Sequence, residues 1–227
     1  MTTPLEFTPA PETRQFLQQQ ALQLRQQLTH TTRPENEQAA TRHELAEILL
    51  ELGDPGQQQE AWQLARQAFA SYRDAEQWEQ AVRCCDQLFR AEQPESIQAL
   101  GNGLWLAVAY PVEPELSVLM LNHLVDATPD SADGAAVAAA VAHYIADLRL
   151  EGSARENLMF LTGALLGKVA ERHSQVHSQA GMDQWMERLA LLDPAQFLPR
   201  LGQVLEALTD GQWWYDRDNL RARMPVN

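Results

Sequence analysis

The chain has 227 residues, of which 45% are apolar and 21% are charged, as in ordinary globular proteins, and its formal net charge is −14. This charge, together with the absence of any Lys/Arg run, argues against nucleic acid or an anionic membrane surface as a ligand. A negative protein instead suits a protein partner with a basic surface.

Cysteine usage and the lack of a targeting segment predict a cytoplasmic protein. The first residues show no charged-then-apolar signal layout, and no apolar run approaches the 18 or so residues expected of a membrane-spanning helix. The only cysteines, Cys84 and Cys85, are adjacent, and on a helix their side chains would point about 100° apart, which is poor geometry for a disulfide. We interpret them as buried, unreactive thiols, with a redox or metal role as the alternative.

Apolar residues recur at helical spacing along most of the chain. Residues 1–11 contain three prolines and predict an extended arm. After it, Leu17, Ala21, Leu24 and Leu28 recur at spacings of three and four, which is typical of an amphipathic helix. The pattern continues between Gly- and Pro-containing breaks, and predicts helices over 12–28, 35–52, 57–72, 75–91, 95–109, 113–127, 133–150, 153–172, 182–192 and 194–208.

No segment combines alternating apolar residues with β-branched enrichment, so no strand is predicted. The sequence therefore predicts an all-α fold of about ten helices. We expect one domain over residues 12–208, either a helical-hairpin array or a compact bundle, followed by a tail over residues 209–227.

Part of this helical region repeats with a period of 36 residues. Shifting the chain by that amount places Leu64 on Leu100 and Phe69 on Trp105. In the following helix, Ala81 falls on Ser117, so that small residues meet small ones and large residues meet large ones.

These positions resemble the tetratricopeptide repeat family over residues 57–129. The first copy supplies the family's aromatic, small, apolar and proline positions with Trp78, Ala81, Cys85, Leu88 and Pro94. In the second copy, "LGNGL" supplies the leucine-small pair, and Ser117, Leu121, Leu124 and Pro129 follow. The copies depart from the family in their period of 36 rather than about 34 residues, in Pro114 at the aromatic position, and in losing the match after residue 130.

The resemblance implies a protein-binding scaffold whose concave surface is lined by the first helix of each pair. Outward polar residues of the helices over 57–72 and 95–109 are then candidates for contact with a partner. These candidates are Gln63, Arg66, Gln67, Gln98 and Asn102.

The stretch "SADGAAVAAAVAHYIADLRL", residues 131–150, predicts a slim central helix. It is too short and too closely bracketed by charges to span a membrane, and its apolar residues cover most of its surface. Ser131 or Asp133 is expected to cap its N-terminus. We interpret His143 as a boundary residue that bonds Asp147 one turn later, with a ligand or pH-sensing role as the alternative.

The segment "ERHSQVHSQ" places His173 and His177 four residues apart, a spacing that can put two imidazoles on one metal ion. The neighbouring residues are polar and the glutamate of an HExxH motif is lacking, so a solvated helix end is the interpretation we prefer. A helical-bundle metal- or ligand-binding protein or enzyme, using these residues with His123 and His143, is the competing hypothesis.

No phosphate-binding loop, nucleophile elbow or paired-cysteine motif is present, and no cofactor is predicted. The glycine motif "GNGLW" follows no predicted strand, so Gly101 is best interpreted as the small residue at a close helix crossing.

The C-terminal segment "DGQWWYDRDNLRARMPVN" combines aromatic and basic residues, the types most often found at binding hot spots. Two interpretations stay open for it. The segment either covers the last apolar face of the array, as terminal repeats must, or it binds a partner or a second copy of the chain. The candidate residues are Trp213, Trp214, Tyr215, Arg217 and Arg221.

Taken together, these features predict a non-catalytic protein–protein interaction module. It would act as a scaffold, an assembly factor or a chaperone-like adaptor that binds a peptide or helix of its partner.

Overall fold

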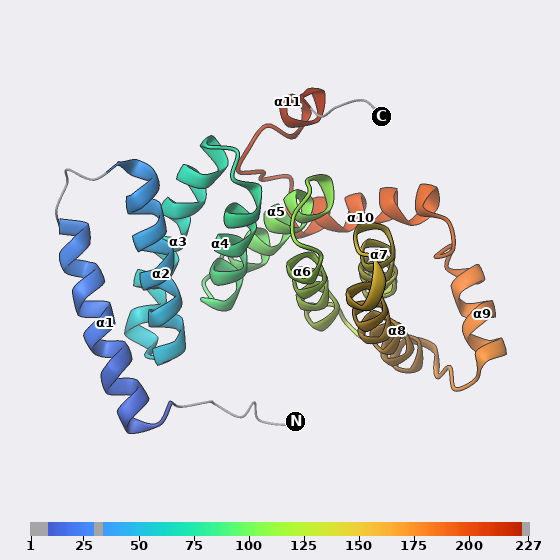
Figure 1. The fold of residues 1–227 in the computed structure, drawn as a ribbon. Helices are drawn as coiled ribbons and strands as arrows, with labels where there is room; N and C mark the ends of the chain where they lie inside the picture. The colour runs from blue at the N-terminus through green and yellow to red at the C-terminus, as the bar shows by residue number, and fades with distance from the viewer. Residues whose placement is uncertain (1–8, 30–33, 224–227) are drawn as a thin grey trace. The chain divides into compact units, whose positions relative to one another are not determined.

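The computed structural model describes residues 9–29 and 34–223, and these residues form eleven helices and no strand (Figure 1). The predicted all-α fold is therefore confirmed. Most of the predicted N-terminal arm lies outside the described residues, and α1 begins at Pro11.

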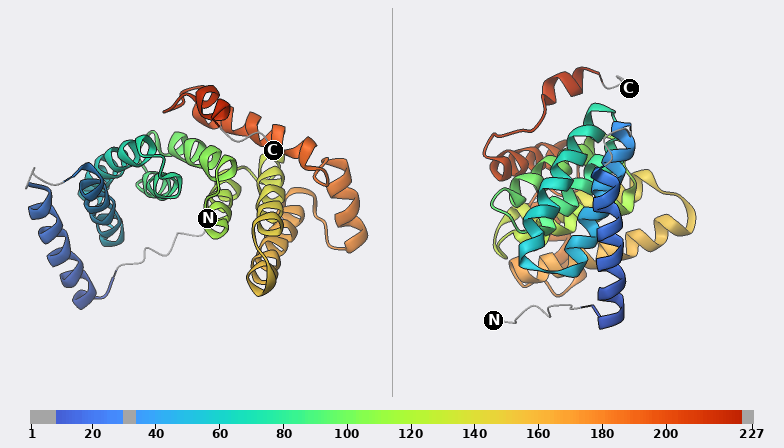
Figure 2. Two further views of the ribbon diagram at one scale, coloured as in Figure 1. Left: turned by 45° about the horizontal axis from the view of Figure 1, so that its top comes forward. Right: turned by 90° about the vertical axis from the view of Figure 1, so that its left-hand side faces the viewer.

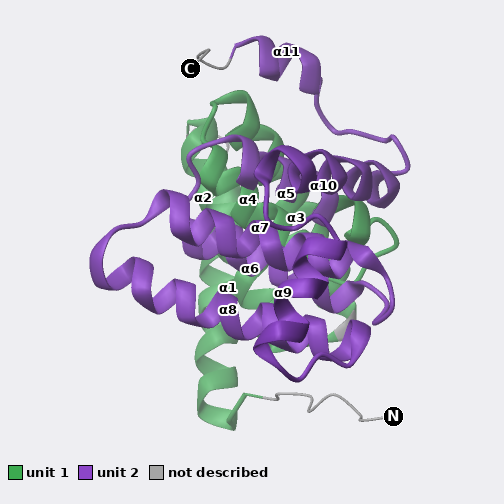
Figure 3. Cartoon of the chain, turned by 90° about the vertical axis from the view of Figure 1, so that its right-hand side faces the viewer, with its two compact units in different colours: residues 1–99 green, residues 100–227 purple. Residues whose placement is uncertain are grey.

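Internal contacts divide the chain into two compact units, residues 1–99 and 100–227 (Figure 3). The boundary falls inside α5 (Ser96–Ala109), between its fourth and fifth residues. Our expectation of a single domain over residues 12–208 stays a prediction, because compact units need not fold separately.

Unit 1 is a series of helices in which each packs against the next along the chain (Figure 2). Its core includes Leu45, Leu49, Phe69 and Leu88, all buried. Gly53 ends the second helix in the left-handed conformation, with φ +68°, and the third begins two residues later. The helices wholly within this unit are α1 (Pro11–Thr29), α2 (Glu35–Leu52), α3 (Pro55–Asp74) and α4 (Trp78–Arg90).

A buried polar network joins α2 to α4. The side chain of Gln87 is buried; its Oε1 lies 2.9 Å from Nδ1 of His43, and its Nε2 donates to the main-chain oxygen of His43 at 3.0 Å. Cys84 and Cys85 are buried beside this network, and burial raises the pKa of both thiols. The predicted burial of the cysteines is confirmed, and a thiol that does not ionise is a poor nucleophile.

Unit 2 is organised around α7, which packs against α6, α8 and α10. The eight residues from Ala135 to Ala142 are all buried, so the predicted central position of the alanine-rich helix is confirmed. Alanine permits close approach of neighbouring helices on several sides while favouring the helix itself. Besides most of α5, unit 2 contains α6 (Pro114–Ala127), α7 (Asp133–Arg149), α8 (Gly152–Ser174), α9 (Gln179–Arg188), α10 (Pro194–Thr209) and α11 (Arg217–Ala222).

The start of α7 differs from the prediction. Its N-cap is Ala132, without a side-chain cap, so the expected cap by Ser131 or Asp133 is wrong. The carboxylate of Asp133 instead binds two other helices: Oδ1 lies 3.3 Å from Nε2 of His173 on α8, and Oδ2 accepts from Arg200 on α10 at 2.9 Å. The carboxylate thus ties three helices together.

Arginine side chains cap the C-termini of several helices. The last carbonyls of a helix lack partners within it, and the guanidinium fork offers several donors at once. Arg149 donates to the main-chain oxygens of Ala107 (2.9 Å) and Val108 (2.7 Å), at the end of α5. The other arginine caps are Arg14 on Leu52 of α2, Arg172 on Val125 of α6, and Arg200 on Leu189 after α9.

Two helix assignments near the C-terminus were wrong or missing. The helix predicted over 182–192 is α9, which begins earlier because the Ser178 hydroxyl caps the amide of Gly181, and ends before Ala190, whose φ is +52°. The short helix α11 was not predicted; the carboxylate of Asp216 caps it. None of the helices within the described ranges is long and apolar enough to cross a membrane.

Candidate functional site

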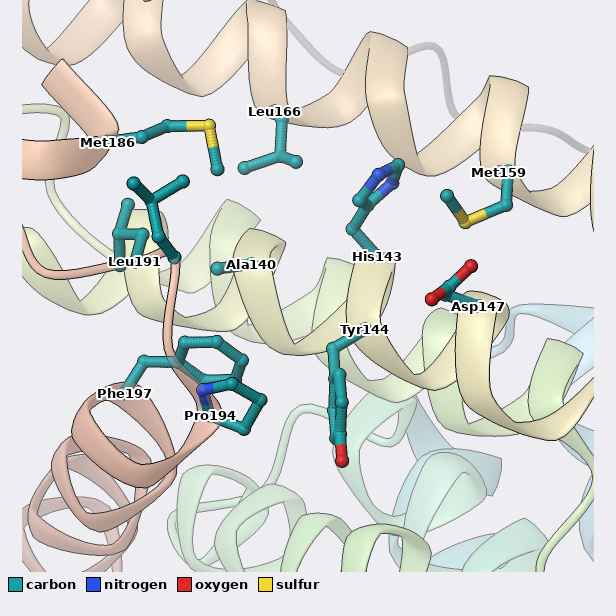
Figure 4. A pocket seen from close by; sticks show the side chains of 11 residues that line it. Ala140, His143, Tyr144, Asp147, Met159, Leu166, Met186, Leu191, Pro194 and Phe197 are labelled. Atoms are coloured by element: carbon teal, nitrogen blue, oxygen red, sulfur yellow. The ribbon is translucent and has the colours of Figure 1, made fainter. Parts of the chain in front are cut away.

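A cavity that carries titratable side chains lies in unit 2, between α7, α8, the end of α9 and the start of α10 (Figure 4). We call it the His143 pocket, and its volume is about 230 Å³. Its polar side chains are His143, Tyr144 and Asp147. The remaining lining is apolar: Ala140, Met159, Leu166, Met186, Leu191, Leu192, Pro194 and Phe197.

Helical spacing on α7 creates one wall of this pocket. Ala140, His143, Tyr144 and Asp147 stand at i, i+3, i+4 and i+7, which places them on one face of the helix. The small side chain of Ala140 leaves room between the larger ones. The ring of Tyr144 meets that of Phe197 edge to face, with 5.7 Å between centroids, and so joins α7 to α10.

Hydrogen bonding defines the protonation of His143. Its Nδ1 lies 2.9 Å from the hydroxyl of Thr162, and that hydroxyl donates to the main-chain oxygen of Leu158 at 2.9 Å. With the single hydroxyl proton on the bond to Leu158, Nδ1 of His143 is assigned as the donor to Thr162. The other ring nitrogen, Nε2, is then an acceptor when the ring is neutral.

Burial lowers the pKa of His143, and the nearby carboxylate of Asp147 opposes this effect only in part. The imidazole is therefore neutral near pH 7. The predicted bond from His143 to Asp147 is wrong, because His143 bonds Thr162 and Asp147 pairs with Arg155 of α8.

One large apolar side chain stands exposed at the pocket. Leu192 lines it and is nevertheless 66% exposed. Exposed apolar groups beside an apolar pocket mark a surface on which another molecule can gain by burial.

The sequence interpretation missed this pocket. Its walls come from α7, α8, and the α9–α10 connection, and no local pattern brings these three segments together. The one available signal was the "LL" of "LALLDP", two adjacent large apolar residues before a predicted break; both line the pocket, Leu191 buried and Leu192 exposed.

The paired-histidine hypothesis does not fit the geometry. Helix α8 ends at Ser174, so His177 stands beyond it and the two rings do not share a helical face. His173 is largely buried and accepts a 3.2 Å hydrogen bond from Nε1 of Trp185, so the expected solvated helix end is also wrong for this residue. His177 is exposed and lies 3.8 Å from Glu171. Within the described ranges, no group of three or more His, Cys, Asp or Glu side chains could hold a metal ion.

The partner-contact residues predicted on α3 and α5 fall into two groups. Gln63 and Gln67 are exposed, while Arg66 and Gln98 are half-buried, and their contact with a partner stays a prediction. Asn102 was expected to face outward, and this is wrong, because it is fully buried and its polar atoms bind the C-terminal segment.

The aromatic and basic residues of the C-terminal segment contact the rest of unit 2. Trp213 donates from Nε1 to Glu206 of α10 at 3.2 Å, and the guanidinium of Arg217 lies 3.7 Å from the centre of the Trp213 ring. Tyr215 and Arg221 lie against Trp105 of α5, and the main-chain amide of Trp214 donates to Asn102. The segment thus covers α10, which directly precedes it, and α5, which lies much earlier in the chain.

The chain matches no protein-family model, no curated protein and no solved structure. The resemblance to tetratricopeptide repeats over residues 57–129 accordingly stays a prediction.

Proposed function

We propose that this protein is a non-catalytic protein-binding module and that its His143 pocket receives an apolar side chain from a peptide or helix of the partner. The observation that carries the proposal is Leu192, a largely exposed leucine at the edge of an apolar pocket. In a monomer such a side chain contributes little to folding, whereas in a complex it gains the full benefit of burial.

The size of the pocket favours an anchoring side chain over a free small molecule. Ligand sites commonly enclose about 300–1,000 Å³, and this pocket holds about 230 Å³. Burying one large apolar side chain contributes about 1.5–3 kcal/mol, enough for a binding hot spot. Met159 and Met186 adapt readily to different shapes, which suits a pocket that accepts an anchor from a flexible peptide.

His143 would give this anchor an orientation. A neutral imidazole offers Nε2 as an acceptor beside the apolar lining, and a donor such as an indole N–H or a peptide N–H matches it. Among the residues that line the pocket there is no serine or cysteine to pair with this histidine, which supports binding rather than nucleophilic catalysis.

The proposal extends to the charge of the partner and to the compartment in which the protein acts. The net charge of −14 suits a partner with a basic surface and disfavours nucleic acid. Two unpaired, buried cysteines suit a reducing compartment such as the cytoplasm. Roles as a scaffold, an assembly factor or a chaperone-like adaptor are all compatible with such a module, and a homodimer is a further outcome of the test below.

Selection from a random peptide library on the immobilised protein tests the proposal. We expect selected peptides to share a large apolar residue and to bind the Leu192→Asp variant at least tenfold more weakly than the wild type. Leu22→Asp is the matched control, because Leu22 is also more than half exposed but lies on α1 in unit 1. Peptides that bind all three proteins equally, or that share no apolar residue, would overturn the proposal.

A further inference from the structure

A second recognition surface lies on α5 and α10, where the motif "GNGLW" meets the C-terminal segment. We call it the Asn102 cradle and define it by Asn102 and Trp105 of α5 with Leu201, Leu205 and Glu206 of α10. In the structure it holds residues 213–215 of the same chain.

The cradle binds the main chain of the segment through Asn102. The side-chain oxygen of Asn102 accepts from the main-chain amide of Trp214 at 3.0 Å, and its main-chain oxygen accepts from the Tyr215 hydroxyl at 2.6 Å. A buried asparagine in the middle of a helix is unfavourable unless its amide is bonded. Because every residue except proline offers a main-chain N–H, the Asn102–amide bond does not depend on the identity of the residue that fills it.

The cradle contacts an aromatic side chain of the segment through Trp105. The rings of Trp105 and Tyr215 lie 5.5 Å apart between centroids, and Trp213 lies 6.2 Å from Tyr215. Aromatic pairs at such distances stabilise a contact beyond what the buried area alone contributes. Glu206 adds an acceptor for the indole N–H of Trp213.

Space for a further side chain adjoins the bound segment. A cavity of about 220 Å³ lies between α5, α10 and α11, and Arg221 of α11 forms part of its wall. Its remaining lining is Trp105, Val108, Ala109, Leu198, Leu201, Gly202 and Leu205. A segment bound here could therefore bury an apolar side chain in addition to its aromatic pair.

The bound segment has the form of a peptide ligand. At its start the chain turns after α10 through Asp210 and Gly211, both of which have positive φ. At its end Asp216 caps α11. Between these points it has no helix or strand, and the side chains of Trp213, Trp214 and Tyr215 are only half-buried. A short, half-buried segment without secondary structure exchanges more readily than a packed helix.

We propose that the Asn102 cradle is a binding site for extended segments that carry aromatic residues, filled here in cis by residues 213–215 and open to a partner segment of the same chemistry in trans. This site is separate from the His143 pocket, so its failure would leave the function proposed above unaffected.

A labelled synthetic peptide of residues 209–223 tests this inference on the full-length protein. A tethered segment competes at an effective concentration near the millimolar range, so we expect the wild type to bind the peptide weakly. Tyr215→Ala removes one hydrogen bond and the Trp105 contact of the tethered segment, and this variant should bind the peptide at least tenfold more tightly. The double variant Tyr215→Ala with Trp105→Ala should lose this tighter binding of the peptide. The double variant Tyr215→Ala with Leu192→Asp should keep it.

Two outcomes would overturn the inference: no binding by Tyr215→Ala at millimolar peptide while its helical circular dichroism is retained, or equal binding by Tyr215→Ala with and without Trp105→Ala. If Tyr215→Ala does not fold, a protease recognition sequence inserted after Gly211 gives a second readout. The cleaved segment should stay bound and be displaced by excess peptide; a segment that leaves and does not rebind would contradict the proposal.

Discussion

A Cβ atom on Gly101 would lie 2.8 Å from Cγ2 of Thr209, so the helices α5 and α10 meet where only glycine fits. Thr209 is buried and its hydroxyl donates to the main-chain oxygen of Leu205 at 3.0 Å, which leaves its methyl group little room to move. The glycine inferred from the sequence to permit a close crossing does so, directly beside the Asn102 cradle.

We expect Gly101→Ala to lower the free energy of unfolding by about 1–2 kcal/mol, because overpacking of about 1–3 kcal/mol exceeds the gain in helix propensity of up to about 1 kcal/mol. Urea denaturation measures the change. Gly167→Ala in the middle of α8 is the control, since a Cβ there meets nothing within 4 Å, and it should be neutral or stabilising. A gain in stability for both Gly101→Ala and Gly167→Ala would show that α5 and α10 do not cross tightly at Gly101.

Arg149 should resist replacement by lysine. Its guanidinium bonds the oxygens of Ala107 and Val108 at once, and a single ammonium group cannot reproduce this fork. Arg149→Ala should lower the free energy of unfolding by about 1.5–3 kcal/mol, and Arg149→Lys should recover less than half of that loss. Arg83→Ala, which removes an exposed pair with Glu79, should change it by less than about 0.5 kcal/mol. Full recovery by lysine would show that charge alone matters at this position.

Stability should decline in mildly acidic solution because of His143. Burial lowers its pKa, so between that pKa and the ordinary value near 6.5 the unfolded chain binds more protons than the folded one. The free energy of unfolding is then fully retained above the unfolded pKa and falls as the pH drops through this window. His43, whose pKa burial also lowers, acts in the same direction.

Chemical denaturation at pH 7.5 and pH 5.5 measures this effect. The wild type should lose stability between the two values, and His143→Gln, which keeps a donor for Thr162 but does not titrate, should lose less. An identical loss in both proteins would mean that His143 does not contribute.

The buried positions of α7 should not accept larger side chains. Ala139 and Ala142 are fully buried between neighbouring helices, and replacing either with leucine should lower the free energy of unfolding by about 1–3 kcal/mol through overpacking. Ala154→Leu, on the exposed first turn of α8, is the matched control and should be nearly neutral. Thermal unfolding followed by circular dichroism separates these cases, and wild-type stability of both buried variants would show that α7 is loosely packed.

Local patterns in the sequence predicted most of the helices. Apolar spacing located ten of the eleven, since burial of one face is a property of each segment by itself. The predicted central role of α7 followed from its composition, because a helix that is apolar on most sides must be covered on most sides. α11 was missed because it is only one and a half turns long and is set by the cap at Asp216 rather than by periodicity.

The His143 pocket and the Asn102 cradle could not be predicted in the same way. The bond from Trp214 to Asn102 joins residues 112 positions apart, and the partner of His143 is Thr162 on the next helix rather than Asp147 on its own. His173 was expected in solvent, yet Trp185 and Asp133 enclose it from other helices. In each case the decisive neighbour comes from a different segment, and spacing along one helix carries no information about it.

The long separation between Asn102 and its ligand also has a consequence for synthesis. Each helix within unit 1 packs against the next one in the chain and can fold as it leaves the ribosome. Asn102 and Trp105 on α5, in contrast, are covered by residues that are synthesised more than a hundred positions later. At roughly 5–20 residues per second, Asn102 and Trp105 are complete for several seconds before Tyr215 exists. During translation Asn102 and Trp105 therefore stay without these later partners until α10 and then residues 213–215 are made, one directly after the other.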